Sequence, residues 1–293
     1  MEQYPPEFSI VVPCFDEEQA IEDTVQFLCE KIETSMAYEV IVVDDGSRDR
    51  TPALLSQVSS RFSSVKVVTH QNNRGYGAAI KTGIRQAAAD IIVITDADGT
   101  YPNEKIPQLV EKCEDQDMVV GARIGTNVVR SGMRAIPKSF LKFWVSWLSR
   151  QPVPDVNSGL RAFKKERAQE HLNILPDGFS LTTTITLAML TNNRSVEFSP
   201  IDYQPRIGNS KIQPVHDTLR FILLVLRTGV YFAPVRAFAP LLIVMAIASV
   251  ISFLYDTFVL QNLTDKTLLL ALFTLNTGMF VLLADMIDKR SAK

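Results

Sequence analysis

The stretch Asp90–Tyr101 reads DIIVITDADGTY and changes character halfway. Its first half is an apolar, β-branched run, which is typical of a strand that is covered on both faces in a parallel sheet. Its second half is polar and places Asp96 and Asp98 two positions apart. Ligands of open α/β sheets bind beyond the carboxyl ends of the strands. The stretch therefore predicts a buried strand that brings two carboxylates to a ligand site.

The same pattern, an apolar run followed by a polar cluster, occurs twice upstream, where the polar clusters are Pro13–Glu17 and Asp44–Asp49. The apolar runs of the chain are Phe8–Val12, Glu39–Val43, Val65–Thr69, Asp90–Thr95 and Met118–Val120. Helical patterns lie between them, near Glu17–Glu33, Arg50–Arg61, Tyr76–Ala88 and Asn103–Cys113. This alternation predicts an α/β fold with right-handed crossovers, in which the polar clusters meet at one crevice.

The bulk composition excludes several classes of protein. The 293 residues carry 30 basic and 32 acidic side chains, and the net charge of −2 gives no general attraction to nucleic acid. The three cysteines are widely spaced and have no histidines at ligand spacing, so we interpret them as reduced thiols. The polar start, Met1–Glu7, is not a signal peptide. We therefore expect the globular part to lie in the cytoplasm.

Two of the polar clusters carry carboxylates. Asp96 and Asp98 can share a hard divalent cation, Mg²⁺ or Mn²⁺, which keeps coordination sites open for phosphates and stabilises the charge of a diphosphate leaving group. In Asp44–Asp49, Gly46 permits a tight turn, and a carboxylate can accept from ribose hydroxyls or a base N–H. A turn followed by a helix cap explains the same cluster. An Asp-rich turn is also the alternative for Asp96 and Asp98, but the occurrence of two such motifs disfavours it.

A basic set follows the predicted sheet and indicates an anionic acceptor, because arginine and lysine match phosphate oxygens: Arg123, Arg134, Arg206 and Lys211. Within this region, the segment 134–150 predicts an amphipathic helix, with Lys138 and Lys142 on one face and Trp144 and Trp147 on the other. Such a helix lies flat in a membrane interface. An amphipathic helix that packs on its own domain fits the pattern equally well.

The long apolar runs lie near the C-terminus. Ala237–Tyr255 and Thr267–Ala284 contain no charged residue, and each approximates the ~20 residues that a helix needs to cross ~30 Å of hydrocarbon. A short polar link separates them, so we predict a transmembrane hairpin; two buried core helices are the alternative. Basic residues flank both ends, which predicts that the globular domain and both termini are cytoplasmic. The four-residue spacing Thr274–Gly278 suits a contact within the hairpin or between subunits of a homo-oligomer.

The predicted domains are therefore a cytoplasmic catalytic domain over 1–212 that includes the helix 134–150, a second interfacial helix over 213–235, and a membrane region over 236–288 with helices at about 237–256 and 266–285.

Six motifs together give a resemblance to a known family. They are Ile10–Glu17 (IVVPCFDE), Val43–Asp49 (VDDGSRD), Asp96–Asp98 (DAD), Gly121–Arg123 (GAR), Asp155–Gly159 (DVNSG) and Arg206–Lys211 (RIGNSK). In this order they are highly specific. The chain closely resembles the inverting family 2 glycosyltransferases of GT-A fold, in particular the polyprenyl-phosphate glycosyltransferases related to dolichol-phosphate mannose synthase. The resemblance runs from about Phe8 to Lys211, and the hairpin matches bacterial members with two transmembrane helices.

The resemblance implies a Rossmann-like nucleotide-sugar domain and roles for the matching residues. The donor would be held by Pro13, Phe15, Glu17, Val43, Asp45, Asp96 and Ala97, and the metal by Asp96 and Asp98. The acceptor phosphate would be held by Arg123, Arg134 and Ser158, and the catalytic residues would be Asp96, Asp98, Arg123, Arg206 and Lys211. Two positions depart from the family: Thr100 and Ser180 stand where many relatives carry Gln and Lys. These departures leave the metal shell and the donor sugar open.

The implied reaction is transfer of a hexosyl group from a nucleotide-sugar, with a UDP-sugar favoured, to a polyprenyl phosphate with inversion. A phosphate oxygen is already anionic at neutral pH and needs no strong general base, so orientation and charge neutralisation are the main requirements. We accordingly interpret the scattered His70, His171 and His216 as structural or solvated. The implied cofactor is Mg²⁺ or Mn²⁺, and the implied partners are the nucleotide-sugar, the lipid acceptor and the membrane.

Four other functions are compatible with some of these motifs. A GDP-mannose-dependent mannosyltransferase, or a glycosyltransferase with a different lipid or a protein acceptor, fits the same residues. A processive polysaccharide synthase is disfavoured because this sequence has neither a Gln-x-x-Arg-Trp segment nor additional membrane helices. A catalytically silent scaffold is disfavoured by the intact Asp96 and Asp98.

Overall fold

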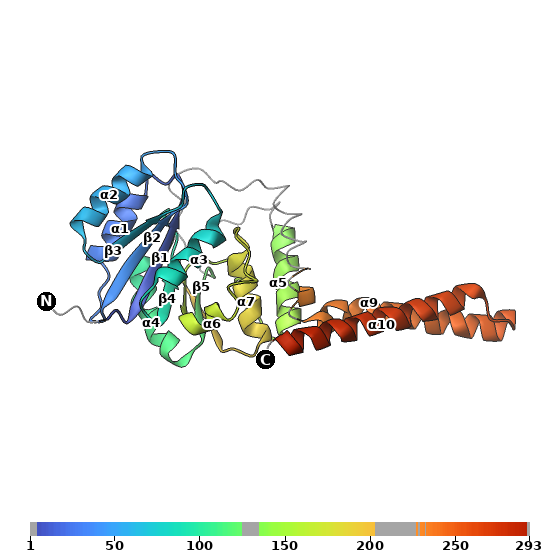
Figure 1. The fold of residues 1–293 in the computed structure, drawn as a ribbon. Coiled ribbons are helices and arrows are strands. Elements are labelled where there is room, and N and C mark those ends of the chain that lie inside the picture. The colour runs from blue at the N-terminus through green and yellow to red at the C-terminus, as the bar shows by residue number, and fades with distance from the viewer. Residues whose placement is uncertain (1–4, 125–134, 203–226, 228, 232, 292–293) are drawn as a thin grey trace.

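The protein is described by a computed structural model that covers residues 5–124, 135–202, 227, 229–231 and 233–291. Its centre is a seven-stranded sheet in the order β3-β2-β1-β4-β6-β5-β7 (Figure 1). The strands are β1 (Phe8–Cys14), β2 (Tyr38–Asp44), β3 (Val65–Thr69), β4 (Ile91–Ile94), β5 (Met118–Ala122), β6 (Arg161–Lys164) and β7 (Val196–Pro200). The helices of the sheet domain are α1 (Ile21–Glu30), α2 (Thr51–Arg61), α3 (Tyr76–Gln86), η1 (Asn103–Lys105), α4 (Ile106–Asp115), α5 (Ala135–Ser149), α6 (Lys165–Gln169) and α7 (Leu181–Thr191).

One strand runs against the others. β6 pairs antiparallel with both β4 and β5, whereas the remaining pairs are parallel. Because an antiparallel strand begins where its neighbours end, the residues just before β6 lie at the carboxyl edge of β4 and β5, with Arg161 opposite Ile94. The segment Asp155–Leu160 is thereby brought to the edge where the sequence predicts the ligand site.

Helices cover both faces of the sheet, as the continuous apolar runs predict. One hydrophobic cluster joins alternate strand residues such as Val12 and Val42 to α1, α2 and α4. The other joins the intervening residues, such as Val11 and Ile41, to α3 and α7. Every residue of β1 is buried, so packing on both faces of the sheet fixes the pairing register of this strand. The position of its carboxyl end relative to the neighbouring strands is therefore fixed as well.

The helix α5 packs on its own domain along one side. Val145 and Leu148 are buried against α7, whereas Phe143 and Trp147 are exposed. Part of the apolar face of the helix, including Leu148, therefore packs on its own domain, as one of the two alternatives predicted, whereas Phe143 and Trp147 stay exposed. The predicted second interfacial helix, 213–235, lies almost entirely outside the described residues.

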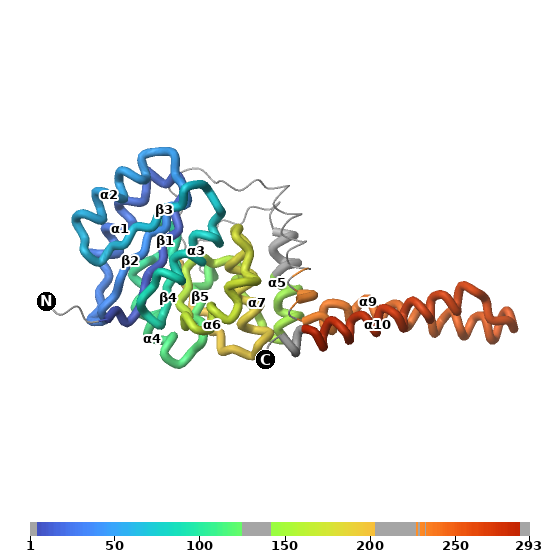
Figure 2. The backbone as a smooth tube through the Cα atoms, viewed as in Figure 1, coloured from blue at the N-terminus to red at the C-terminus, as the bar shows by residue number. Residues whose placement is uncertain are grey.

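Two C-terminal helices form a hairpin that projects from the sheet domain (Figures 1 and 2). The first is α9 (Pro234–Tyr255), which continues into the π-helical η3 (Asp256–Leu260), and the second is α10 (Asp265–Ser291). Both are long and apolar enough to cross a membrane, and only 6% and 11% of their most apolar windows are buried. This exposure argues against two buried core helices.

Polar side chains join the two helices of the hairpin along their contact. Ser249 and Thr274 hydroxyls lie 3.1 Å apart, Ser252 and Thr267 hydroxyls lie 2.5 Å apart, and Thr264 N–H donates to Asp256 at 2.8 Å. Thr274 thus contacts the other helix of the same hairpin. A Cβ added at Gly278 meets nothing within 4 Å, so this glycine does not mediate a close contact between the described helices.

The hairpin also contacts the sheet domain at its base. Trp147 Nε1 donates to the carbonyl of Arg236 at 3.2 Å, and the Arg236 guanidinium donates to the carbonyl of Leu148. α5 and the start of α9 are therefore joined by hydrogen bonds in both directions.

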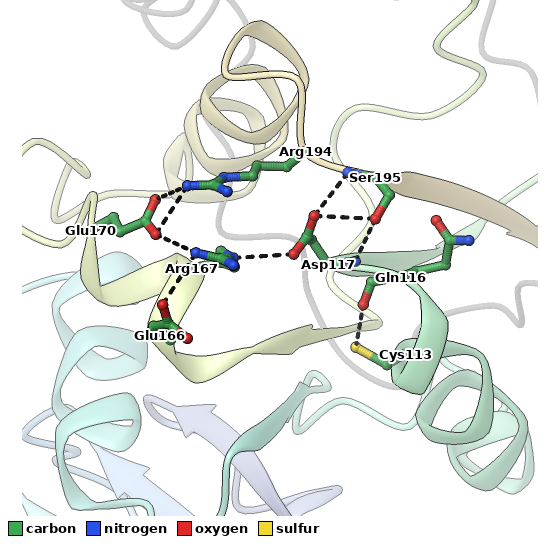
Figure 3. Close-up of polar contacts among 8 residues, drawn as sticks. All are labelled: Cys113, Gln116, Asp117, Glu166, Arg167, Glu170, Arg194 and Ser195. Carbon is green, nitrogen blue, oxygen red and sulfur yellow. Dashed lines mark hydrogen bonds and ion pairs between the residues drawn. The ribbon is translucent and has the colours of Figure 1, made fainter. Parts of the chain in front are cut away.

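A surface network of charges ties three other elements together (Figure 3). Arg167 of α6 bonds Asp117, at the start of β5, at 3.1 Å and Glu170 at 2.7 Å. Arg194 also bonds Glu170, and Asp117 accepts from the backbone N–H of Ser195 at 3.0 Å. The network fastens α6 and the turn before β7 to the sheet.

Candidate active site

A cleft of about 280 Å³ lies at the carboxyl ends of β1, β2 and β4. It brings together most of the residues that the resemblance assigned to the donor and the metal: Pro13, Phe15, Glu17, Asp45, Asp96, Ala97 and Asp98. It also includes residues that the sequence did not single out: Cys14, Asn73, Gly75, Tyr76, Ala79 and Phe179. The prediction that three strand ends converge on one crevice is confirmed.

Val43 does not line this cleft. It is fully buried in β2 and packs with α3 and α7 in the second hydrophobic cluster. Its predicted role in holding the donor stays a prediction, since the side chain itself serves the core.

The carboxylate of Asp45 organises the loop before α3. Its oxygens accept from the backbone N–H groups of Arg74 at 2.9 Å and Gly75 at 2.7 Å, and one of them lies 2.6 Å from His70 Nδ1. His70 Nε2 in turn lies 2.9 Å from the Thr82 hydroxyl. His70 is therefore structural, as predicted, and Asp45 stabilises the cleft wall as well as lining it.

Reciprocal hydrogen bonds join the loop after β1 to the loop after β2. Asp16 N–H donates to Ser47 Oγ at 2.9 Å, and Arg48 N–H donates to Asp16 at 2.7 Å. Glu17 N–H donates to Thr51 Oγ1 at 3.0 Å. Gly46 lies between them with a φ of +75°, which confirms the tight turn that glycine permits there. The polar residues after β2 thus serve as a turn and also position Phe15 and Glu17.

Asp96 is held between two neighbours from distant parts of the chain. The Tyr76 hydroxyl donates to Asp96 at 2.8 Å. Burial and the negative charge of Asp96 raise the pKa of Tyr76 well above its ordinary value, so the phenol keeps its proton and acts as the donor. On the other side lies Gly159, where an added Cβ would come within 2.8 Å of both carboxylate oxygens. Only glycine permits this approach.

Asp98 is held by its own loop. It is 6% exposed and accepts from Thr100 twice, from the hydroxyl at 2.7 Å and from the backbone N–H at 3.2 Å. The carbonyl of Ala97, between the two carboxylates, accepts from the Thr24 hydroxyl of α1 at 3.0 Å. Thr100, one of the two departures from the family pattern, therefore orients Asp98.

Arg123 and Asp155 form a bidentate ion pair. Arg123 Nε and Nη2 donate to the two carboxylate oxygens at 2.7 and 3.0 Å, and the Arg123 backbone N–H adds a third bond at 3.1 Å. Burial raises the pKa of Asp155, but the hydrogen bonds and charge of Arg123 outweigh it, so the pKa lies below its ordinary value. The motif Asp155–Gly159 thus fixes one predicted acceptor residue.

Ser158 is fully buried just before β6, and its hydroxyl has no hydrogen-bond partner among the described residues. Its carbonyl accepts from the guanidinium of Arg161, which also bonds Thr182 and Thr186 of α7. Burial lowers the pKa of Arg161, which nevertheless stays charged at neutral pH. Sequence reasoning missed Arg161, because nothing in a four-residue strand marks a buried cation. The predicted Arg134, Arg206 and Lys211 lie outside the described residues.

The carboxylate pair fits a divalent cation whose remaining ligands come from a substrate. Asp96 and Asp98 line the same cleft, and within the described residues no group of three or more His, Cys, Asp or Glu side chains could hold a metal ion. Mg²⁺ is commonly bound by one or two carboxylates together with substrate phosphates and water. Asp96 and Asp98 therefore suit an ion that arrives with, or is completed by, a diphosphate.

Known proteins resemble this chain in sequence and in fold. A dolichyl-phosphate hexose transferase of Haloferax volcanii is 31% identical over 211 residues, which cover 71% of this chain and 87% of that protein. A low-salt glycan biosynthesis hexosyltransferase of the same organism is 25% identical over 227 residues. These residues cover 75% of this chain but only 53% of the length of that relative.

A crystal structure of glucosyl-3-phosphoglycerate synthase from Mycobacterium tuberculosis, in complex with Mn²⁺, UDP and glucosyl-3-phosphoglycerate, has a TM-score of 0.56 at 19% identity. The likeness covers 76% of this chain and 80% of that one, and the predicted GT-A fold is confirmed. Residues 9–170, more than half of the sequence, match the family described as glycosyl transferase family 2. The chain belongs to glycosyl transferase family 2.

Proposed function

We propose that this protein transfers a hexosyl group from a nucleotide-sugar, preferably a UDP-sugar, to a polyprenyl phosphate with inversion. The observation that carries the proposal is the convergence of Phe15, Asp45, Asp96 and Asp98 on one cleft at the strand ends. The similarity to a dolichyl-phosphate hexose transferase supports a polyprenyl-phosphate acceptor. The UDP and Mn²⁺ of the similarly folded synthase support a UDP-sugar and a divalent ion.

The donor side of the mechanism relies on prearranged carboxylates. Asp45 and Glu17 would orient the nucleoside, and Asp96 and Asp98 would hold Mg²⁺ or Mn²⁺ beside the diphosphate. The ion supplies Lewis-acid stabilisation of the charge that grows as the glycosidic bond breaks. Tyr76 and Thr100 fix Asp96 and Asp98, so this side needs little rearrangement during the reaction.

The acceptor side would neutralise and aim the lipid phosphate. Arg123 is held by Asp155, and the buried Ser158 hydroxyl can donate to an anionic oxygen. The phosphate oxygen attacks the anomeric carbon from the side opposite the leaving diphosphate, and the carbon inverts. Arg134, Arg206 and Lys211 complete this side as predictions from the sequence.

We further propose that the hairpin spans the membrane, with the sheet domain and both termini on the cytoplasmic side. Its exposed apolar surface and the basic residues at its ends support this orientation. The arrangement would bring the cleft to the depth of a lipid head group, with the domain boundary close to residue 212.

The test is sugar transfer by the detergent-solubilised protein, with Mg²⁺ or Mn²⁺, to undecaprenyl phosphate and to dolichyl phosphate. UDP-glucose and further UDP-sugars are compared with GDP-mannose. We expect lipid-linked sugar from one donor, lost on chelation with EDTA. Nucleotide-sugar binding without any lipid product would contradict the polyprenyl acceptor, and turnover with GDP-mannose alone would contradict the UDP preference.

A further inference from the structure

Phe179 is an exposed aromatic side chain in the wall of the cleft. It is 64% exposed, although it lines the same cleft as Asp96 and Asp98. Its ring stacks on that of Tyr76, with centroids 5.3 Å apart and planes 21° from parallel. A large apolar side chain that is held in place but left exposed in the wall of a cleft is a candidate ligand contact, because exposure of its surface to water is unfavourable.

The loop that bears Phe179 is fastened to α3. Lys81 pairs with Asp177 at 2.5 Å and donates to the carbonyl of Leu175 at 3.0 Å. Ala78 N–H donates to the carbonyl of Asp177 at 3.1 Å. The contact is so close that a Cβ at Gly77 would lie 2.2 Å from the carbonyl oxygen of Pro176. These contacts fix the backbone of the loop, so the ring of Phe179 is presented at a defined place.

The ring pair connects the open side of the cleft to the carboxylate of the proposed diphosphate site. Tyr76 stacks on Phe179 and donates its hydroxyl proton to a hydrogen bond with Asp96. Phe179 therefore lies one ring beyond the residue that contacts Asp96. In a nucleotide-sugar both the nucleoside and the hexose are joined directly to the diphosphate. Glu17 and Asp45 are the residues proposed to orient the nucleoside, which leaves the hexose as the part of the donor that can meet Phe179.

We propose that the open surface of Phe179 is the platform on which the hexose ring of the donor packs, an inference that rests on the proposed function. A pyranose presents axial C–H groups, which carry partial positive charge, and the face of an aromatic ring carries partial negative charge. The sugar thereby covers apolar surface, and Tyr76 keeps the platform in register with Asp96. The platform recognises a hexosyl group and makes no contact with the nucleoside.

The prenyl chain of the acceptor is the other apolar group that could cover Phe179. The sugar is favoured because the ring stacks on Tyr76, which bonds Asp96 on the proposed donor side, and because the loop of Phe179 is fixed by α3 rather than by the hairpin. The two possible occupants can be distinguished by removing the ring. If the hexose covers Phe179, the nucleotide-sugar binds more weakly; if the prenyl chain covers it, the lipid acceptor does.

The experiment measures the affinity of the full-length protein in detergent for UDP-glucose and for UDP by calorimetry, with GDP-mannose and GDP as a second pair. The variants are Phe179→Leu, which keeps apolar bulk without a ring, and Phe179→Tyr, which keeps the ring. The control is Gly178→Ala in the same loop, where an added Cβ meets nothing within 4 Å.

We expect Phe179→Leu to weaken the binding of the nucleotide-sugar about three- to tenfold, while the affinity for the free nucleotide stays at the wild-type level. Phe179→Tyr and Gly178→Ala should bind both ligands like the wild type. The KM for undecaprenyl phosphate should not change in Phe179→Leu.

Three results would overturn the platform. They are an unchanged affinity of Phe179→Leu for the nucleotide-sugar, an equal loss for nucleotide and nucleotide-sugar, and a rise confined to the KM for undecaprenyl phosphate, which would assign the ring to the lipid. Failure of the proposed function is distinct, because it is seen in the wild type as an absence of binding to every nucleotide and nucleotide-sugar.

Discussion

Two neighbouring regions, the acidic wall of the cleft and an arginine cluster that adjoins it, hold their charged groups in opposite ways. On the acidic side (Asp45, Asp96 and Asp98), carboxylates are fixed by backbone N–H groups and neighbouring hydroxyls. On the arginine side (Arg123, Asp155 and Arg161), guanidinium groups are fixed by a carboxylate and by carbonyl oxygens. The sides meet where Gly159 lies against Asp96. A site that must bind a cation, a diphosphate and a second phosphate needs this separation of charge.

The comparison is tested most severely by Asp98→Asn. We expect the rate of sugar transfer to fall about 10³-fold, because loss of the negative charge weakens metal and diphosphate binding in the transition state. The melting temperature should be nearly unchanged, since the Asn carbonyl can still accept from Thr100. Thr100→Ser keeps the hydroxyl and serves as the matched control. Wild-type turnover by Asp98→Asn would remove the acidic side from the chemistry.

Asp45→Ala should destabilise the wall of the cleft on the acidic side. The N–H groups of Arg74 and Gly75 and the buried ring of His70 lose their partner, and the free energy of unfolding should fall by about 1–3 kcal/mol. Denaturant unfolding in detergent and nucleotide binding measure the two consequences. The control is Asp49→Ala, which removes a carboxylate from the more open part of the same loop region. If both variants are equally stable, Asp45 does not organise the cleft wall.

Arg123→Ala should lower the free energy of unfolding by an amount that depends on pH. A carboxyl with a depressed pKa, such as Asp155, stabilises the fold above its ordinary pKa of about 3.9 and loses this contribution as the pH falls through the folded value. Removal of Arg123 leaves the burial that raises the pKa, so the variant should lose about 2 kcal/mol of stability at pH 7.

The stability difference between Arg123→Ala and the wild type should shrink as the pH falls below about 4 toward the depressed folded pKa of Asp155, because below that value the carboxyl is protonated in both proteins. Unfolding curves from pH 3 to pH 8 measure it, with Lys112→Ala as a control that breaks a partly exposed ion pair. A difference that is constant over this range would show that Arg123 does not act through the charge of Asp155.

The smallest effect is expected outside both sides, in the surface network of Figure 3. Arg167→Ala should lower the free energy of unfolding only slightly, and much less than Asp45→Ala, because ion pairs near the surface contribute little. The loss should be smaller in high salt, which screens the charges. Melting curves at low and high salt check this, and a loss as large as that of Asp45→Ala would mean that the network is as important as the cleft wall.

The acidic side could be predicted from the sequence and much of the arginine side could not. Val65–Thr69 was predicted with its observed bounds, and the other predicted strands differ by at most a few residues, because continuous apolar runs before polar clusters identify parallel strands. β6 and β7 gave no such signal, since β6 has only four residues and begins with Arg161. Its antiparallel pairing depends on contacts between distant parts of the chain.

Gly75 and Phe179 were missed for the same reason. Their roles depend on the packing of the loop 175–180 against α3, nearly a hundred residues away, and no local pattern encodes it. The cleft residues Phe15, Asp45 and Asp96 could be predicted because each closely follows its own strand.

The hydrogen bonds between Trp147 and Arg236 and between Arg236 and Leu148 have a kinetic consequence. In the proposed arrangement, in which the hairpin spans the membrane, these hydrogen bonds to α5 would hold the cleft at a constant height above the membrane surface. An anchored enzyme meets an anchored substrate in two dimensions, and tethering raises the effective concentration of the acceptor. We therefore expect the rate in vesicles to follow the mole fraction of acceptor in the bilayer rather than its bulk concentration, so that added inert lipid acts as an inhibitor by dilution.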